Sequence, residues 1–546
     1  MVKMKERNNQ LKAAIGNMAP VKRIIESNNI PSEDTTNKQG YAAYSLDDEL
    51  KLISMLNTLK LEPQFYRSES QTMRELSELI EKLALNDPYF VAQCIVYSRC
   101  LGEGMRSINH LAATLLAPFI AGKDFAKRFY GPFNKKTKSG GCIYRPDDMS
   151  EIKDIFDVLN PNVSALTNAM KKGFKSVIES LDTYQIAKYK KSVMDIANLC
   201  HPDSKLSNAV INVNGEEMKT IDALMKGISI SADTWEVTQS EAGQEIAKAV
   251  KEGRIDKKEA KQILDEAKSL NWKELLHDNK LGILAALRNI RNILNTNPDA
   301  ETINMLCDLI SNPNALRNGK IMPYQIDLAF TTINDVNNSE YSNTIKNALL
   351  KGYELSIPNL KETLTGKTLV MVDCSGSMHV RCTTKNGKHA RSACQQAGLI
   401  AATIAKAVNA DIIRFGTHAE FFNTNSYMNT NVFELGTYIS YSNMGCTSIA
   451  SAFDLIKRYK KSYDRIIILS DNECNYGVVS KSYKEYIRSV CSPYIYAVDL
   501  AAYGTTPVKG DKVNYYYGYG YRFFDDISSK EFNPNMHIDK IRKIII

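Results

Sequence analysis

Apolar residues recur every three or four positions between about residue 45 and residue 359, which is the spacing of one face of an α-helix. Short breaks rich in Pro, Gly or Asn, such as Asn86-Asp87-Pro88, separate the amphipathic stretches. The pattern predicts helices at about 45–59, 70–84, 88–101, 104–121, 149–159, 163–181, 192–200, 242–269, 281–296, 300–311, 323–334 and 341–355. Because strand-like alternation is missing, we expect an α-helical HEAT-like repeat (an α-solenoid), with a helical bundle as the alternative.

The pattern changes near residue 360. Residues 367–373 form a largely apolar run that ends in a carboxylate, as a buried parallel strand would. Similar runs follow at 411–415, 465–470 and 494–498, and helix-like stretches lie between them at 392–408, 448–459 and 481–490. Alternating strands and helices predict an open, Rossmann-like α/β sheet, whose ligand site lies beyond the carboxyl ends of its strands.

Composition and charge divide the chain in the same place. Its 546 residues, 44% of them hydrophobic, suffice for two to four domains and exclude a mini-protein or a disordered tail. Residues 1–360 carry 46 basic and 45 acidic side chains, whereas residues 361–546 carry 23 and 16, so the surplus of positive charge lies in the last third. A net charge of +8 is far from the dense positive charge of a histone-like protein.

The cysteines and the apolar runs indicate the compartment. Eleven cysteines, an odd number with no Cys-x-x-Cys pair, are typical of free thiols in a reducing environment. The N-terminus is polar, and the longest apolar stretch, 111–122, is shorter than the roughly 20 residues that span a bilayer. We therefore expect a cytoplasmic protein with no membrane partner.

The first predicted strand ends in Asp373-Cys-Ser375-Gly-Ser377, a D-x-S-x-S array. One carboxylate and two hydroxyls offer hard oxygens that suit Mg²⁺ or Mn²⁺. Thr447, before a predicted helix, and Asp471, at the end of another strand, would complete the ligand shell. The alternative is that the two serines only satisfy backbone groups in a turn.

This array predicts binding rather than catalysis. A catalytic two-metal centre needs further clustered carboxylates, and only Glu473 lies nearby in the sequence. Together the three segments resemble the metal-ion-dependent adhesion site of a von Willebrand factor A domain. A Walker motif at Thr365-Gly366-Lys367-Thr368 is excluded, because Lys361 stands where its first glycine should be.

A helical region followed by this metal-site domain resembles the Ro autoantigen (TROVE-domain) family over most of the chain. The resemblance is carried by segments in the same order and spacing, namely 172–175, 187–190, 195–201, 284–289, 321–329, 369–373 and 470–473. It implies an N-terminal extension at 1–40, a helical-repeat ring at 41–360 and an A domain at 361–546 that joins the ends of the ring.

The same resemblance implies a function. Family members bind small noncoding Y RNAs on the outside of a monomeric ring and the 3′ ends of misfolded RNAs in its basic hole, as ribonucleoprotein scaffolds in RNA quality control. They are not enzymes, and in some members a partner exoribonuclease degrades the RNA. Lys188, Lys190 and His201 match positions that contact RNA, whereas Lys191 follows a segment shorter than in animal relatives.

Two basic clusters support RNA binding independently of the resemblance. Seven basic residues and one acid lie between Lys123 and Arg145, including Lys135 and Lys136, with aromatic residues interleaved that could stack on bases: Phe125, Phe129, Tyr130, Phe133 and Tyr144. A second cluster comprises Lys171, Lys172, Lys175, Lys188, Lys190 and Lys191.

Each of these candidates has a plainer alternative. Lysine-rich helix faces are usually only solvated, and His201 could cap a helix before Pro202. Arg288, on an otherwise apolar helix, could form a structural ion pair instead of contacting phosphate. We expect residues 515–521 to be a terminal loop that packs its tyrosines on the A domain. The alternative function is a metal-dependent protein-interaction scaffold that binds no RNA.

Overall fold

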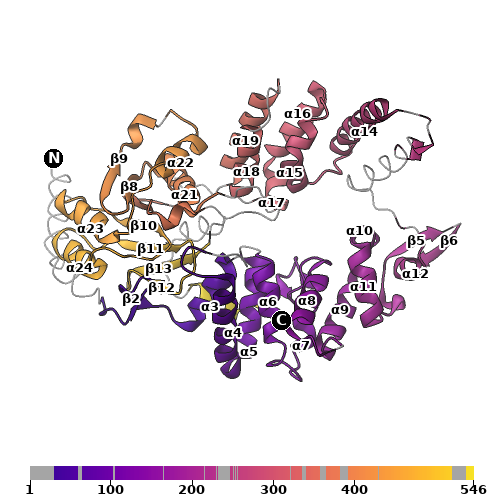
Figure 1. Ribbon diagram of the computed structural model, residues 1–546, viewed down its shortest axis with the longest axis horizontal. Coiled ribbons are helices and arrows are strands. Elements are labelled where there is room, and N and C mark those ends of the chain that lie inside the picture. The colour runs from indigo at the N-terminus through magenta and orange to yellow at the C-terminus, as the bar shows by residue number, and fades with distance from the viewer. Residues whose placement is uncertain are drawn as a thin grey trace, which may run out of the picture. The chain divides into compact units, whose positions relative to one another are not determined.

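The computed structural model shows a chain built of two compact units (Figure 1). It describes residues 30–59, 64–102, 105–163, 165–213, 215–228, 230, 246, 248–249, 251–252, 254, 256–319, 321, 323–334, 340–356, 364–380, 391–427, 429–518 and 536–546. The first 29 residues, the start of the expected helix at 242–269 and the end of the 515–521 tract lie outside them.

The α/β unit comprises the described residues of 1–47, 361–517 and 529–536, and the helical unit those of 48–360, 518–528 and 537–546. Residues 41–47, expected in the helical region, and residues 537–546, expected in the A domain, thus each lie with the other unit. Residues 30–47 belong to the α/β unit, and residues 537–546 belong to the helical unit.

The helical unit follows the predicted sequence of amphipathic stretches. Its helices are α3 (Asp48–Thr58), α4 (Glu69–Asn86), α5 (Pro88–Val96), a π-helical turn (Tyr97–Leu101), α6 (Ser107–Leu116), α7 (Ala126–Phe129), α8 (Asp148–Leu159), α9 (Asn168–Ser180), α10 (Thr183–Lys188), α11 (Lys190–Cys200), α12 (Thr220–Met225), α14 (Lys257–His277), α15 (Ile283–Leu294), α16 (Ala300–Ile310), α17 (Pro313–Asn318), α18 (Pro323–Asn334), α19 (Ser342–Ser356) and α26 (Met536–Arg542).

Polar side chains at the predicted breaks fix where helices begin. Ser68 and Gln71 form a reciprocal capping box at the start of α4. Asp87 ends α4, and its carboxylate then accepts a hydrogen bond of 3.0 Å from the backbone N–H of Phe90 in α5. Pro88 stands at the first position of α5, where its missing N–H costs nothing.

Three expectations for this region were wrong. A β-hairpin of β5 (Val210–Val213) and β6 (Glu216–Lys219) interrupts the helices where no strand was expected. The helix α6 ends at Leu116, short of the expected residue 121, and α9 begins at Asn168 instead of residue 163. The side chain of Thr167 accepts a hydrogen bond from Met170 N and caps α9, so the residues before Thr167 lie outside the helix.

The α/β unit holds a six-stranded sheet of order β13-β11-β10-β7-β8-β9. The strands are β7 (Thr368–Asp373), β8 (Asp411–Phe415), β9 (Ala419–Phe422), β10 (Arg465–Ser470), β11 (Tyr494–Asp499) and β13 (Val513–Tyr517). Only β9 runs antiparallel to its neighbour. The four predicted strands are confirmed, but residues 515–517 form an edge strand and not the expected terminal loop.

The central strand β7 is fully buried, and this fixes the position of its carboxyl end. Every residue of β7 is buried, and the helices of the unit are α21 (Ala393–Val408), α22 (Val432–Ser440), α23 (Ile449–Arg458) and α24 (Val479–Ser489). The N-terminal segment adds β1 (Thr35–Thr36) and β2 (Ala42–Ser45), and β2 pairs with β12 (Thr505–Thr506). Because β8 and β10 flank β7 on opposite sides, the strand order reverses there, which is where ligands bind in such sheets.

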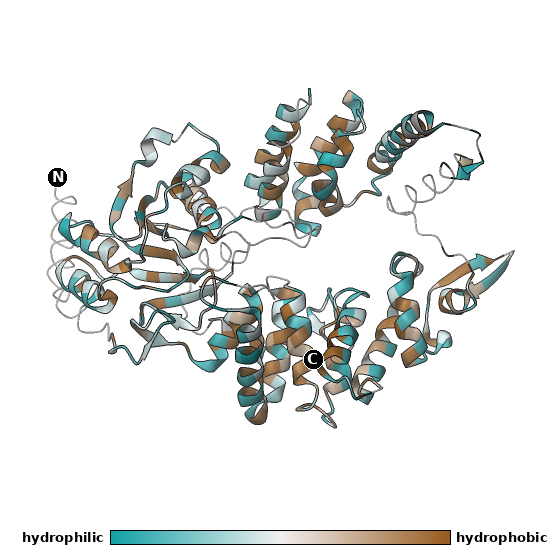
Figure 2. Ribbon diagram, viewed as in Figure 1, coloured by the Kyte–Doolittle hydropathy of each residue, from teal (hydrophilic) through white to brown (hydrophobic). Residues whose placement is uncertain are grey.

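Hydropathy follows the same division (Figure 2). The strands of the α/β unit are largely hydrophobic, whereas many helices show both hydrophobic and hydrophilic residues along their length. None of the helices in the described part of the chain is both long and apolar enough to cross a membrane. The expected combination of a helical region and an α/β domain is confirmed, while closure of the helices into a ring stays a prediction.

Candidate nucleic-acid interface and metal site

The two basic clusters of the sequence lie together on the helical unit. The two clusters meet where α9 packs against α7, and the helices can approach so closely because Gly173 has no side chain. A Cβ at Gly173 would lie 2.6 Å from the backbone of Tyr130 and 2.8 Å from the carbonyl oxygen of Lys127. Lys127 and Arg128 of α7 are exposed, and Lys172 is exposed on α9, so the helices present their lysines from adjacent elements.

A short hairpin extends this basic surface. Strands β3 (Phe133–Asn134) and β4 (Ser139–Gly140) pair around a turn that holds the exposed Lys135, Lys136 and Lys138. The side chain of Asn134 shapes the turn, because its Oδ1 accepts a hydrogen bond of 2.9 Å from the backbone N–H of Lys136. Lys135 Nζ lies 4.4 Å from the centre of the Tyr144 ring, a cation–π contact that restrains the ammonium group.

The segment 188–191 joins the same surface through one aromatic ring. Tyr189 separates α10 from α11, and the guanidinium carbon of Arg145 lies 5.6 Å from the centre of its ring. Lys188, Lys190 and Lys191, the sequence neighbours of Tyr189, are all exposed. We name the combined set the basic surface, and it comprises Lys127, Arg128, Lys135, Lys136, Lys138, Arg145, Lys172, Lys188, Lys190 and Lys191.

The structure separates the two remaining RNA candidates. His201 ends α11 in the left-handed conformation, with φ of 48°, and its backbone N–H donates a hydrogen bond of 2.9 Å to Ala197 O. The main chain of His201 therefore caps the helix, as the plainer alternative expected. Its side chain is exposed. Arg288 is exposed on α15, which packs on α16 and α18 and not on the basic surface. Within the described residues Arg288 forms no ion pair, so the structural alternative finds no support there.

The aromatic part of the first cluster was predicted wrongly. Phe129, Tyr130 and Phe133 are buried and belong to the core of the helical unit, so they cannot stack on RNA bases. Phe125 meets Tyr89 edge-on at 4.9 Å, and Tyr144 lies between two cations. The basic surface can therefore neutralise phosphates, but most of its aromatic residues serve packing.

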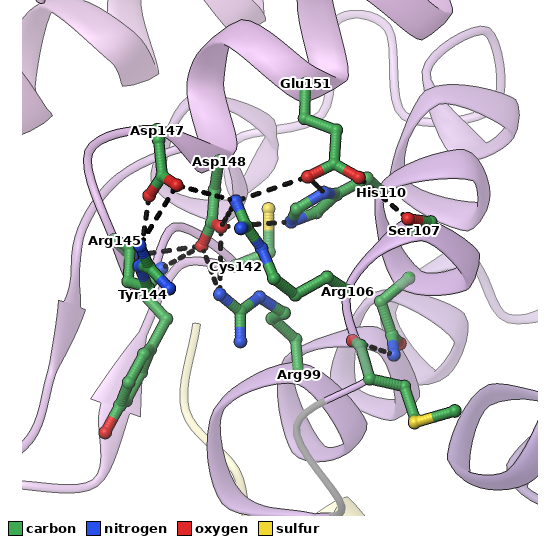
Figure 3. Close-up of polar contacts among 12 residues, drawn as sticks. Arg99, Arg106, Ser107, His110, Cys142, Tyr144, Arg145, Asp147, Asp148 and Glu151 are labelled. Carbon is green, nitrogen blue, oxygen red and sulfur yellow. Dashed lines mark hydrogen bonds and ion pairs between the residues drawn. The ribbon is translucent and has the colours of Figure 1, made fainter. Parts of the chain in front are cut away.

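A buried ion network lies next to the basic surface, and Arg145 contacts both (Figure 3). Arg99, on the π-helical turn, donates to both carboxylate oxygens of Asp148 at 2.8 Å, and the Asp148 side chain is fully buried. Asp148 also accepts hydrogen bonds from the backbone N–H groups of Tyr144 and Arg145. The network further includes Arg106, Ser107, His110, Asp147 and Glu151.

Electrostatics keeps this network ionised. Burial alone would raise the pKa of Asp148, but hydrogen bonds from His110 and the charge of Arg99 lower it well below its usual range. The pKa of Glu151 is lowered to about 2, against the effect of burial, by its hydrogen bond with His110. Burial opposes protonation of His110, yet its two carboxylate partners raise its pKa above the ordinary value of 6.5. Arg145 itself pairs with Asp147 at 3.1 Å, so network and surface share one residue.

The metal-site candidates converge at the carboxyl ends of the central strands. Asp373 ends β7, and its carboxylate accepts from Ser375 N at 2.9 Å and from Ser470 Oγ at 2.5 Å. The hydroxyls of Ser375 and Ser377 are 3.3 Å apart. A hydrogen bond of 2.8 Å from Gly376 N to Gly445 O ties this turn to the loop that holds Thr447, which is buried.

Asp471 completes the group from β10. The side chain of Ser377 hydrogen-bonds to Asp471, which also accepts from Glu473 N at 3.1 Å. All five predicted ligands, Asp373, Ser375, Ser377, Thr447 and Asp471, therefore lie at one edge of the sheet. Among the described residues no cluster of three or more His, Cys, Asp and Glu side chains is arranged to hold a metal, so an ion here would need the hydroxyl oxygens.

The charges of this site fit a cation. Burial and the nearby Asp471 raise the pKa of Asp373 to about 7, and burial also raises the pKa of Asp471. Burial raises the pKa of Glu473 to about 8, and neither of its carboxylate oxygens accepts a well-formed hydrogen bond within the described residues. Buried carboxylates are costly without a counter-ion, and a divalent cation held by Asp373, Ser375, Ser377, Thr447 and Asp471 would supply one.

Comparison with known proteins adds one decisive observation. Residues 238–410 match the TROVE domain. The resemblance to the TROVE family is thereby confirmed over these residues. Arg288 and the Asp373-to-Ser377 turn lie inside the matched range, whereas the basic surface precedes it. The crystal structure of the Deinococcus radiodurans RO (RSR) protein is similar at 13% identity and a TM-score of 0.45, over 88% of this chain and 98% of that one. No curated protein sequence matches the chain.

Sequence reasoning missed two contributors to these sites. Ser470, whose hydroxyl donates to Asp373, could have been found because it stands at the end of a predicted strand. The contact between Arg145 and Tyr189 joins residues 44 positions apart and leaves no local pattern. The packing of α9 on α7 likewise joins residues that are far apart in the sequence.

Proposed function

We propose that this chain is an RNA-binding protein of the Ro type. It binds a small noncoding, Y-like RNA and the 3′ ends of misfolded RNA, and it serves as a ribonucleoprotein scaffold in cytoplasmic RNA quality control. The observation that carries the proposal is the continuity of the basic surface, which gathers two lysine-rich segments on one unit. The TROVE match supports the choice of RNA over other polyanions.

The basic surface suits phosphates held by single ammonium groups. Lys135, Lys136, Lys172, Lys188, Lys190 and Lys191 are its exposed contacts, with the exposed side chain of His201 at the end of α11. Each neutralised phosphate releases counter-ions, so binding should weaken steeply with salt. Arg288 would act separately, on the part of the helical unit that lies within the TROVE match.

The proposed activity is binding without catalysis. The metal site offers two carboxylates and three hydroxyls and suits ligand capture by Mg²⁺ or Mn²⁺ rather than hydrolysis. When bound, the cation would provide an open coordination position for an acidic or phosphate ligand. RNA degradation would then require a partner exoribonuclease.

A titration of two RNAs tests this function. The full chain is mixed with a structured RNA that carries a single-stranded 3′ tail, with the same RNA lacking the tail, and with duplex DNA of equal length. We expect submicromolar binding of the tailed RNA that falls by orders of magnitude between low and physiological salt. Equal affinity for tailed RNA and duplex DNA would contradict the proposal.

A second candidate is a metal-dependent protein-interaction scaffold. It is favoured by exposed apolar side chains on the loops next to the metal site, since Tyr441 is 83% exposed and Tyr476 is 59% exposed. Such a rim, with Val380 and Val478, would surround a partner's carboxylate bound to the cation. This function predicts a protein ligand whose binding is abolished by a chelator and is unaffected by RNA.

A further inference from the structure

The α/β unit carries most of the surplus positive charge, and one part of it is concentrated at the end of α23. Residues 457–461 read Lys-Arg-Tyr-Lys-Lys. The helix α23 starts beside the metal loops, and its end lies at the opposite edge of the sheet. There, Lys461 Nζ lies 2.8 Å from Asp411 Oδ2, and Asp411 is the first residue of β8. This cluster is therefore separate from the metal site.

Two of the four cations in this cluster already have carboxylate partners. Lys457 pairs with Asp454 and Glu485, and Lys461 pairs with Asp411. Arg458 and Lys460 are exposed and form no ion pair within the described residues. These two cations are available for an anionic ligand.

An exposed aromatic ring stands between them. Tyr459 is 62% exposed, and its ring meets Phe421 edge-on with the ring centres 5.8 Å apart. Beside Phe421 the surface forms a hollow of about 270 Å³ lined by Asp411, Ile412, Phe421, Phe422, Asn423, Thr424 and Lys461. The hollow is below the usual size of a drug-like ligand site, but it combines aromatic walls with carboxylate, amide and hydroxyl groups.

We infer that this end of α23 is a second contact site for single-stranded RNA. Arg458 and Lys460 bind neighbouring phosphates, an unpaired base stacks on Tyr459, and the hollow beside Phe421 accepts the edge of the next base. Stacking on an exposed tyrosine requires unpaired bases, which favours a single strand over a duplex. The inference rests on the proposed function only in taking RNA as the ligand, since it uses a different unit and different residues.

Fluorescence anisotropy with a labelled oligouridine of roughly 16 nucleotides tests the site on the full chain. Lys460→Glu should lower the slope of log K against log salt by about 0.7, the value for one phosphate of a single strand. Tyr459→Ala should weaken binding about fivefold or more, because it removes the stacking platform. The matched controls are Lys481→Glu, an exposed lysine near the start of α24, and Tyr41→Ala, a tyrosine that is 46% exposed.

Photo-cross-linking locates the contact directly. An oligouridine containing 4-thiouridine should cross-link to the peptide that holds Tyr459 or Phe421. Binding by the Lys460→Glu and Tyr459→Ala variants that equals the controls would overturn the second site. So would cross-links confined to the helical unit, or equal competition by polyglutamate.

Failure of this site and failure of the proposed function give different results. If the wild-type chain binds the tailed structured RNA but not oligouridine, the second site is wrong and the RNA-binding function stands. If it binds neither RNA, both are wrong.

Discussion

The guanidinium of Arg145 lies 5.6 Å from the centre of the Tyr189 ring and links the two basic segments of the helical unit. Arg145 is also paired with Asp147, which belongs to the buried ion network. The contact thus connects a surface that can bind phosphates to a rigid support beneath it.

Replacing Arg145 with Met should weaken RNA binding more than the loss of one charge explains. Without the guanidinium, the Tyr189 ring loses a cation–π contact of about 0.5–1 kcal/mol, and the link between residues 145 and 189 is lost. We expect a fall in affinity for tailed RNA with almost unchanged melting temperature. Arg145→Lys should restore the charge without the full stacking, and an affinity equal to that of Arg145→Met would show that the guanidinium is needed. Wild-type affinity in Arg145→Met would refute the link.

Asp148→Ala should destabilise the helical unit by about 3–5 kcal/mol, because it leaves the buried Arg99 guanidinium without its carboxylate. Urea denaturation followed by circular dichroism measures the loss. Asp154→Ala is the matched control, since the Asp154 side chain is 75% exposed on the same helix. If the two variants unfold at the same urea concentration, the network contributes no more than a surface ion pair.

His110 should make stability depend on pH. Its pKa is raised in the folded protein, so its protonation stabilises the fold below the unfolded value of 6.5, and this contribution is lost as pH rises through the folded pKa. Asp148 and Glu151, whose pKa values are lowered, remain ionised throughout this range. His110→Gln should therefore cost more stability near pH 6 than near pH 9. A loss that is constant with pH would mean that folding leaves the pKa of His110 unchanged.

Mg²⁺ should raise the melting temperature of the wild-type chain, since a ligand that binds only the folded state stabilises it by mass action. Asp373→Ala should abolish this shift by removing the carboxylate at the end of β7. Asp511→Asn, an exposed carboxylate of the same unit, should keep it. An unchanged Mg²⁺ shift in Asp373→Ala would show that the cation binds elsewhere.

Local patterns in the sequence were enough to predict the alternation of strands and helices and the position of the metal turn. A hydrophobic run followed by Asp373 and two serines has one natural place in an open parallel sheet, at the end of a central strand. The caps at Ser68 and Asp87 likewise follow from local chemistry. These features depend on residues that are close together in the chain.

Features that depend on distant residues could not be predicted. The pairing of β2 with β12 joins Ser45 to Thr505, and Arg542 pairs with Glu49 in the helical unit. Neither contact leaves a local signal. Phe129 and Tyr130 were misread for a related reason, because the turns around α7 place basic residues outside and aromatic residues inside over only a few positions.

The central claim is that the basic surface binds RNA, and a double charge reversal at Lys188 and Lys190 tests it most directly. The control is Arg317→Glu with Lys351→Glu, two exposed cations elsewhere on the helical unit that change the net charge equally. We predict that Lys188→Glu with Lys190→Glu lowers the affinity for tailed RNA at least tenfold and reduces the salt slope by about 1.4. Affinity and salt slope equal to those of the control variant would contradict the claim.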